Sequence, residues 1–427
     1  MHSSERLYYS DSFLTTFAGS ITGTRELPVA GGESLWQLAL DRSAFYPTSG
    51  GQPFDTGLLR TTSGSGASAE VRVEQVEEDE EGAVWHFVRR PLATGTRIEG
   101  QIDWNRRFDH MQQHTGQHLL SAVFLRELHA PTVSFHLGES ISTIDLATSG
   151  LEDHSLQSVE RLANEIIAED RLVSIGYVSR TEAEALLATG ELRKLPERQG
   201  TIRLIEIADY DRNACGGTHV CSTGQIGGLL VRGAEKVSRG IRIEFVCGLR
   251  AVNAARADSA ALGQMTALLS TGTGDLPAAV ERIQADAKAG KKECQKLREE
   301  LATFQAQALA MEAPVENDLR LIVRGWKNQS GDYVKLLAAR TAAAAPSTAV
   351  IFSALDSDPV RVFVARSQNL NIDCGRILRE ELNRLGLRGG GSSDRAQGEV
   401  PTEYEPALQA SLSEAIRNAV TEAHSES

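Results

Sequence analysis

The stretch FDHMQQHTGQHLLSAVFLREL, residues 108–128, carries the clearest structural pattern in the chain. Its apolar residues recur at close to helical spacing, which predicts a helix. They are Met111, Leu119, Leu120, Val123 and Phe124. Within this helix His114 and His118 are four residues apart, so one turn places both imidazoles on the same face. Two histidines at this spacing also occur by chance, so the pair needs a second half to form a binding site.

The second half is the segment CGGTH, in which Cys215 and His219 are also four residues apart. Thiolate and imidazole are natural zinc ligands, and this spacing suits a single ion. Gly216 and Gly217 permit a tight turn, so that both side chains can point at one position. A gap of about 100 residues between the halves suits an enzyme, because structural zinc fingers usually close over short loops. The two halves predict a zinc site with these ligands: His114, His118, Cys215 and His219.

Other side chains near these motifs compete for the same roles. Cys221 could join a cysteine-rich structural site, but a buried, small apolar role at a strand start is expected. His110, four residues before His114, could be a ligand or support one, and a surface or core position is expected instead. Asp211 could accept the N–H of a ligand imidazole, or it could simply begin a turn.

A catalytic zinc ion needs one exchangeable position, where it lowers the pKa of a bound water to ~7 or polarises a carbonyl. Four protein ligands would close the site unless one of them dissociates. Two roles therefore stay open. Either one ligand is loose, or the ion positions the substrate while another group orients the water.

Outward from these motifs, the sequence predicts an α+β protein in four parts. Residues 1–100 combine short β-rich stretches with turn clusters, which predicts a small β-barrel. Residues 101–250 alternate strands with helices over Leu156–Asp170 and Thr181–Thr189, which predicts an α+β zinc domain. Residues 314–427 alternate again and predict a small α/β domain, in which RGGGSSDRAQGEV (388–400) is expected to be a loop.

Residues 251–313 are rich in Ala, Glu, Lys, Gln and Leu and predict a helical arm. Apolar and small residues step 3-4-3-4 without a slip, as in the a and d positions of a coiled coil, which predicts a coiled-coil hairpin or a packing arm. They are Val280, Ile283, Ala287, Gly290, Cys294, Leu297, Leu301, Phe304 and Ala308. Gly290 and the alanines weaken this seam, so it does not establish a dimer by itself.

Composition limits the function classes. The net charge of −13 argues against broad, non-specific nucleic-acid binding, which depends on phosphate neutralisation. Acidic residues crowd positions 74–81, where a solvated hairpin tip is expected. Five irregularly spaced cysteines, with neither a secretory signal nor a membrane-length apolar run, predict a protein of the reducing cytoplasm.

Four motifs carry a family resemblance in the family's order: FYPTSGGQPFDTG (45–57), HTGQHLL (114–120), CGGTHV (215–220) and GIRIEFVCG (240–248). Over roughly residues 1–250 the chain resembles the long form of the alanyl-tRNA editing proteins called AlaX, and the matching editing region of alanyl-tRNA synthetase. The heptad stretch and the tail with GGGSSDRAQG resemble the C-terminal DHHA1-type domain of that synthetase.

The resemblance implies that the four predicted ligands hold zinc, and that the substrate is tRNA(Ala) wrongly charged with serine or glycine. A site that activates alanine cannot reject glycine by size, and it discriminates an added hydroxyl only ~10²-fold in comparable cases, so a second site must hydrolyse the errors. By position in the family, Thr132 and Ser134 are candidates for the contact to the serine hydroxyl, or strand residues facing water. Thr115 could orient the water or the terminal adenosine.

Two further groups are candidate contacts to RNA. Gly50, Gly51 and Gln52 form the family's glycine motif, where close backbone approach to the tRNA end or between domains is expected, and a plain tight turn explains them equally well. Arg193 and Lys194 lie in the locally basic stretch 193–203, which is equally compatible with a solvated helix end and strand.

The leading hypothesis is therefore a zinc-dependent esterase that edits in trans. One alternative is a DHH-type phosphoesterase, but its Asp-His-His motif fails at the third position of Asp109-His110-Met111. The other is a non-catalytic tRNA-binding module with a structural zinc. A homodimer through the C-terminal region is a further expectation.

Overall fold

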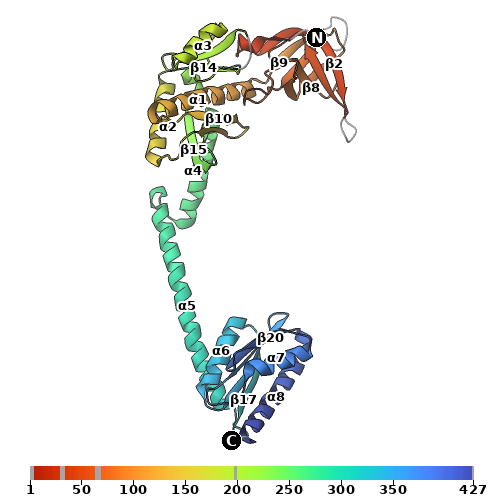
Figure 1. Ribbon diagram of the computed structural model, residues 1–427, viewed down its shortest axis with the longest axis vertical. Helices are drawn as coiled ribbons and strands as arrows, with labels where there is room; N and C mark the ends of the chain where they lie inside the picture. The colour runs from red at the N-terminus through yellow and green to blue at the C-terminus, as the bar shows by residue number, and fades with distance from the viewer. Residues whose placement is uncertain (1–3, 29–33, 63–68, 197–199, 426–427) are drawn as a thin grey trace. The chain divides into compact units, whose positions relative to one another are not determined.

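The structure is a computed structural model that describes residues 4–28, 34–62, 69–196 and 200–425. Its contacts divide the chain into two compact units, residues 1–264 and 265–427. Each unit combines helices with β-sheets, so the predicted α+β class is confirmed (Figure 1). The boundary between the units falls inside helix α4 (Leu249–Leu269), within the predicted helical arm 251–313. No helix in the described ranges is long and apolar enough to cross a bilayer.

The first unit begins with a seven-stranded sheet in the order β6-β5-β9-β2-β3-β8-β7. Its strands are β2 (Thr16–Leu27), β3 (Leu35–Leu40), β5 (Gly57–Thr61), β6 (Glu70–Val73), β7 (Gln75–Glu78), β8 (Val84–Val88) and β9 (Arg97–Ile102). Only Glu74 separates β6 from β7, although these strands are the two ends of the order, so the sheet curls on itself. Leu38, Leu59 and Val76 are among the fully buried residues inside this curl.

The acidic stretch 74–81 lies at the β7–β8 hairpin, as its turn residues predict. Its carboxylates are not all solvated, however. Glu78 pairs with Arg6 at 2.6 Å, and Glu74 pairs with Arg89 at 2.9 Å. Asp79 accepts a hydrogen bond from the Trp85 indole at 2.7 Å. Part of the negative charge is therefore used to hold the hairpin in place.

The predicted helix exists as α1 (Trp104–Leu128). It begins where the Asp103 side chain accepts a hydrogen bond from the Arg106 N–H, and it ends at His129, which has the left-handed conformation favoured at helix ends. Every residue from 110 to 124 is buried, because other elements of the unit pack around this helix. Gly116 is required there, since a methyl group in its place would lie 2.3 Å from the Cys247 sulfur.

Two sheets and helix α2 pack around α1, and helix α3 packs against the second of these sheets. One sheet has the order β10-β11-β16-β15, and the other has the order β12-β13-β14. The bounds are β10 (Thr132–Leu137), β11 (Ser142–Leu146), β15 (Leu229–Val237), β16 (Gly240–Cys247), β12 (Val173–Val178), β13 (Ile202–Ile207), β14 (Asp211–Ala214), α2 (Asp153–Ala168) and α3 (Arg180–Ala188). Helices α2 and α3 match the two predicted helices within three residues at each end. Strand β14 leads directly into Cys215 and so brings the second ligand pair to α1.

The predicted arm 251–313 contains most of helix α4 and, after a break at residues 270–275, the long helix that carries the heptad seam, α5 (Leu276–Glu312). Near its C-terminal end it packs against α6 (Gly331–Ala344) through Ala302, Ala306 and Leu309. These residues lie beside the predicted seam, not on it, and the seam residue Phe304 is 70% exposed. Alanines allow close helix packing, which a search for large apolar residues does not detect.

The second unit has three layers, with helices on both faces of a sheet of order β17-β18-β19-β21-β20 (Figure 1). Its other elements are β17 (Arg320–Trp326), β18 (Thr348–Ala354), β19 (Val360–Arg366), β20 (Gly389–Gly391), β21 (Arg395–Val400), α7 (Cys374–Arg384) and α8 (Glu405–Ser425). Val350 and Phe352 face α5 and α6, whereas Ala349 and Ile351 face α7 and α8. Residues 388–400, expected to be a loop, form a β20–β21 hairpin instead. The sequence pattern did not indicate β20, because its three glycines pair as a strand without any side-chain alternation.

Candidate metal centre

The four predicted ligands converge at one point. Ligand atoms of His114, His118, Cys215 and His219 all lie within 4.8 Å of one another. The Cys215 sulfur is 3.4 Å from Nε2 of His114 and 3.4 Å from Nε2 of His219. In a tetrahedral site with Zn–S near 2.3 Å and Zn–N near 2.0–2.1 Å, a sulfur and a nitrogen lie about 3.5 Å apart. Both the spacing and the donor set therefore fit a zinc ion.

Burial prepares these groups unequally for a cation. It lowers the pKa of His114 to about 3, and it holds the pKa values of His118 and His219 well below their ordinary value. The three imidazoles are therefore neutral and offer lone pairs without first losing a proton. Burial also raises the pKa of the Cys215 thiol, so a metal ion must displace the thiol proton when it binds.

Each histidine is oriented by a second polar side chain. Gln52 Oε1 lies 2.8 Å from Nδ1 of His114, and Thr115 Oγ1 lies 3.1 Å from Nδ1 of His219. Both oxygens can accept an Nδ1–H, which leaves Nε2 on the cysteine side unprotonated for a metal. The third histidine, His118, has the side-chain amide of Asn213 as its neighbour, with 3.2 Å between Asn213 Nδ2 and His118 Nδ1.

Gln52 reaches His114 from the tip of a tight turn. Gly50 and Gly51 have φ angles of +55° and +80°, which favour glycine, and Ser49 and Gln52 close the turn by backbone hydrogen bonds. Gln52 is fully buried and also bonds to the N–H of Thr218 at 3.1 Å. The glycine motif, predicted to contact RNA, thus places a support for the metal ligand, while its two glycines remain exposed.

The base of this turn is anchored to α1. Arg107 and Asp55 form an ion pair in which both side chains are completely buried. Arg107 also donates to the carbonyls of Ser12 and Ala44, and the Asp55 carboxylate accepts from the Tyr46 N–H at 2.6 Å. This network fixes the motif FYPTSGGQPFDTG relative to the helix that carries His114 and His118.

Close packing explains the second motif. A methyl group on Gly217 would meet the His114 ring at 2.2 Å, so only glycine fits there. Arg203 donates from Nη1 to the carbonyls of Cys215 and Gly217 at 2.7 and 2.9 Å. One member of the basic stretch 193–203 therefore supports the ligand loop from beneath. Residues 197–199 of that stretch, including Arg198, lie outside the described residues.

The outer end of the same stretch connects to a ligand. Arg193 pairs with Asp211 at 2.5 Å, and Asp211 bonds to Asn213, the neighbour of His118. Asp211, predicted to accept a hydrogen bond from a ligand imidazole, therefore reaches His118 only through Asn213. Lys194 is exposed.

The two candidates for the contact to a serine hydroxyl, Thr132 and Ser134, both lie on β10 but have different hydrogen-bond partners. Thr132 donates to Ser121 Oγ at 2.8 Å, and the Gln117 amide bonds to the same oxygen at 2.9 Å. The hydroxyl of Ser134 instead donates to Asp145 at 2.7 Å. Adjacent strand residues face opposite sides, and the Phe135 ring lies beside His114, so Ser134 points the other way.

Two competing ligands lie elsewhere. His110 is buried and is not part of the ligand cluster, as expected for a core residue. Cys221 is exposed, so the expectation that it is buried was wrong. It follows the buried Val220 in a loop, where its N–H bonds to the Gln225 side chain and its thiol turns outward.

Two family models match the chain. Residues 2–106 match the class II (A) tRNA synthetases, and residues 202–244 match the second additional domain of threonyl and alanyl tRNA synthetases. The alanyl-tRNA editing protein AlaX-L of Pyrococcus horikoshii is 28% identical over 430 residues, which covers 96% of this chain and 97% of that protein. The chain is thus similar to an AlaX-type alanyl-tRNA editing protein over nearly its whole length.

Alanine–tRNA ligases are also similar to this chain. The Pyrococcus abyssi ligase is 32% identical over 407 residues, covering 92% of this chain and 42% of the ligase. The Methanoculleus marisnigri ligase is 31% identical over 376 residues, covering 87% and 40%. The chain thus spans about two fifths of the ligases' length. The C-Ala domain of Aquifex aeolicus alanyl-tRNA synthetase matches 24% of the chain at 20% identity and a TM-score of 0.21, too low to support an argument.

Proposed function

We propose that this chain hydrolyses the aminoacyl ester of tRNA(Ala) mischarged with serine, and also with glycine, at a zinc ion. The observation that carries the proposal is the convergence of three neutral imidazoles and one thiol from segments about 100 residues apart, in a chain similar to an editing protein. A bound zinc ion would supply a Lewis acid for the ester carbonyl or lower the pKa of a water to ~7. As part of this proposal, the protein works in the cytoplasm.

The residues of the chain supply orientation. Gln52 and Thr115 hold two ligand imidazoles with Nε2 toward the cysteine sulfur. Cys215 is the one ligand of the four that is partly exposed, so we place the approach of the ester on its side of the cluster. We also propose that the exposed Gly50 and Gly51, and the basic Arg193 and Lys194, contact the tRNA.

Selection of serine would depend on hydrogen bonding. We assign the contact to the Thr132, Ser121 and Gln117 cluster, because Gln117 Oε1 is buried without a partner among the described residues. An unsatisfied buried acceptor favours a ligand that brings a hydroxyl, and it disfavours alanine, which lacks one. Ser134 could take part only if its hydroxyl left Asp145.

One observation favours a second function, a tRNA-binding module with a structural zinc. Four protein ligands surround the candidate position, and closed four-ligand sites are typical of structural zinc. The phosphoesterase alternative has no such support. Asp109 forms an ion pair with Arg250 at 2.5 Å, and Met111 offers no ligand at the third position of the motif.

A deacylation assay separates the two functions. The substrates are Ser-, Gly- and Ala-tRNA(Ala), and the proteins compared are zinc-loaded, metal-stripped and Cys215→Ala. We expect rapid loss of serine, little loss of alanine, and collapse of activity in the last two proteins. A zinc-loaded protein that binds tRNA but leaves all three esters intact would establish the structural role instead. Full activity after stripping would overturn both uses of the metal.

A further inference from the structure

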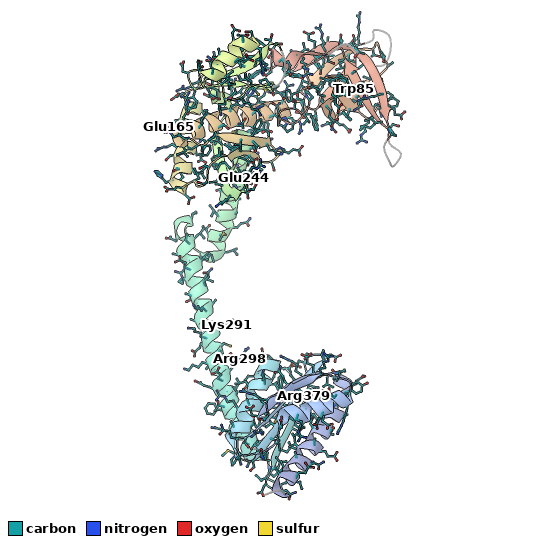
Figure 2. All side chains as sticks on the ribbon, in the orientation of Figure 1. Trp85, Glu165, Glu244, Lys291, Arg298 and Arg379 are labelled. Atoms are coloured by element: carbon teal, nitrogen blue, oxygen red, sulfur yellow. The ribbon has the colours of Figure 1, made fainter. Side chains whose placement is uncertain are left out.

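The three imidazoles of the cluster, which lie in the densely packed first unit (Figure 2), differ in the group that faces Nδ1. His114 faces an amide oxygen and His219 faces a hydroxyl oxygen, and both of these atoms can accept an Nδ1–H. His118 instead faces an amide nitrogen, because Asn213 Nδ2 lies 3.2 Å from its Nδ1. An amide –NH2 group only donates, so this contact requires an Nδ1 that carries no proton. The single proton of the neutral His118 ring is then on Nε2.

The orientation of the Asn213 amide follows from its other neighbour. Its Nδ2 also donates to the carboxylate of Asp211, which is paired with Arg193 at 2.5 Å. A carboxylate has no proton to donate, so the amide nitrogen and not the amide oxygen must face it. Turning the amide over to offer its oxygen to His118 would place that oxygen against the carboxylate. Arg193 and Asp211 therefore keep the donor side of Asn213 toward the imidazole.

This arrangement makes His118 a different kind of ligand from the other two histidines. A nitrogen that binds a metal must carry no proton. His114 and His219 meet this condition at Nε2 while they keep their Nδ1 contacts, and each Nε2 lies 3.4 Å from the Cys215 sulfur. Among the described residues, His118 makes no such contact with the sulfur. To bind through Nε2 it must move its proton to Nδ1, where two donors then face each other. Of the three histidines, only His118 loses a hydrogen bond when it binds.

We propose that His118 is the exchangeable ligand of the metal site, and that Asn213 is a positioning residue that keeps it exchangeable. The inference rests on the hydrolysis proposed above, which needs a catalytic ion with one open position. His114, Cys215 and His219 remain as ligands when the His118 ring turns away with its Nε2 proton in place, and a water or the ester oxygen can take the vacated position. His118 is also the most exposed of the three imidazoles, at 7% against 1% and 3%.

Nitrogen-15 NMR of the metal-free full chain tests the tautomer directly, because protonated and bare ring nitrogens have well separated chemical shifts. The signals of His118 are those that disappear in His118→Gln. We expect Nε2–H for His118 and Nδ1–H for the other two imidazoles. In Asp211→Asn the Asn213 amide can turn over and accept, so His118 should change to the Nδ1–H form. The matched control is Asp209→Asn, which removes an exposed acid from the same turn and should keep the native form. An Nδ1–H form of His118 in the native chain would overturn the proposal.

Zinc affinity tests the consequence for the metal site. Competition with a chelator should show about 10-fold tighter binding in Asp211→Asn than in the native chain, because the third imidazole then binds without losing a hydrogen bond. Asp209→Asn should keep the native affinity, and His118→Ala should weaken binding less than His219→Ala. If Asp211 only supported a ligand, as carboxylates near metals usually do, Asp211→Asn would bind zinc about 10-fold or more weakly, and that result would contradict the proposal.

Turnover separates this inference from the hydrolysis on which it rests. Zinc-loaded Asp211→Asn should hydrolyse Ser-tRNA(Ala) with a kcat lowered about 10-fold although it binds zinc more tightly, because its fourth position opens less often. If the native chain left the ester intact while the tautomer and affinity results held, the proposed hydrolysis would fail and the assignment of His118 would stand. If the native chain hydrolysed the ester while Asp211→Asn lost zinc, the hydrolysis would stand and the assignment would fail.

Discussion

Gly217 lies so close to the His114 ring that a methyl group in its place would meet ring atoms at 2.2 and 2.4 Å. We predict that Gly217→Ala displaces this ligand and lowers zinc affinity about 10- to 100-fold, the usual range for disturbing the support of a ligand. Competition with a chromophoric chelator measures the affinity. Gly216→Ala is the matched control, because its nearest neighbour would be Tyr9 at 3.6 Å, an ordinary contact. Equal affinities in both variants would show that the ring and the loop move apart at no cost.

Thr115 has two interpretations that kinetics and metal binding can separate. Its hydroxyl lies 3.1 Å from His219 Nδ1 and accepts from the Val220 N–H at 3.2 Å, which indicates a positioning role. We predict that Thr115→Val lowers zinc affinity about 10-fold or more, whereas Thr115→Ser keeps the acceptor and stays near the native value. If the valine variant instead bound zinc normally and only lost turnover, the hydroxyl would act on the water or the adenosine.

Residue patterns could predict the ligands but not their supports. A four-residue spacing on a helix and in a glycine turn is visible in the chain itself, so the four ligands were predicted and the structure brings them together. Gln52 and Asn213 reach the same centre from a turn and a strand whose positions follow from tertiary packing. Their contacts cannot be derived from spacing, and Gln52 was predicted to touch RNA for that reason.

At the scale of elements, the curled sheet holds a histidine that makes its stability depend on pH. His86 on β8 is fully buried between Ser43 Oγ at 2.7 Å and the Leu38 carbonyl at 3.0 Å. Burial lowers the pKa of His86 to about 4. The unfolded chain binds a proton below about pH 6.5 while the folded chain does not, so this stabilisation is complete above pH 6.5 and is lost as pH falls through 4.

We predict a loss of about 3 kcal/mol in the free energy of unfolding of this sheet across that window. Urea denaturation followed by Trp36 and Trp85 fluorescence reports on β3 and β8 once Trp104→Phe and Trp326→Phe are present in every protein compared. The His86→Gln protein should have a lower free energy of unfolding at neutral pH, and this free energy should change less with pH across the window. His136→Gln, at an exposed position, should follow the native curve. If the free energy of unfolding of His86→Gln depended on pH as steeply as that of the native protein, other titrating groups would be responsible for the dependence.

Element prediction succeeded where periodicity is strong and failed where small residues take part. Helices α1, α2 and α3 follow from apolar spacing. The packing face of α5 does not, because Ala302 and Ala306 are small and the larger seam residues point elsewhere. Strand β20 consists of glycines alone, which give no alternation to detect.

At the scale of the whole molecule, all four ligands belong to the unit 1–264, and the described residues contain no second cluster of this kind. A metal at this site would join α1 to the loop 215–219 and leave the second unit chemically untouched. Ligand binding to the folded state stabilises it by RT ln(1 + [L]/Kd), about 4 kcal/mol at 1,000 times Kd. The stabilisation should therefore be confined to one unit.

We predict that removing zinc from the full chain increases hydrogen exchange in α1, β13 and β14, and leaves exchange in β17, β18 and β19 unchanged. The reason is that the first group holds or adjoins the ligands, whereas the second lies in a unit with its own cores. Mass spectrometry of peptides from the chelated and zinc-loaded protein measures both groups in one sample. In Cys215→Ala the chelator should change little, because the site has already lost its thiolate. A response spread evenly over both units would mean that the metal, or the unit boundary, lies elsewhere than the geometry indicates.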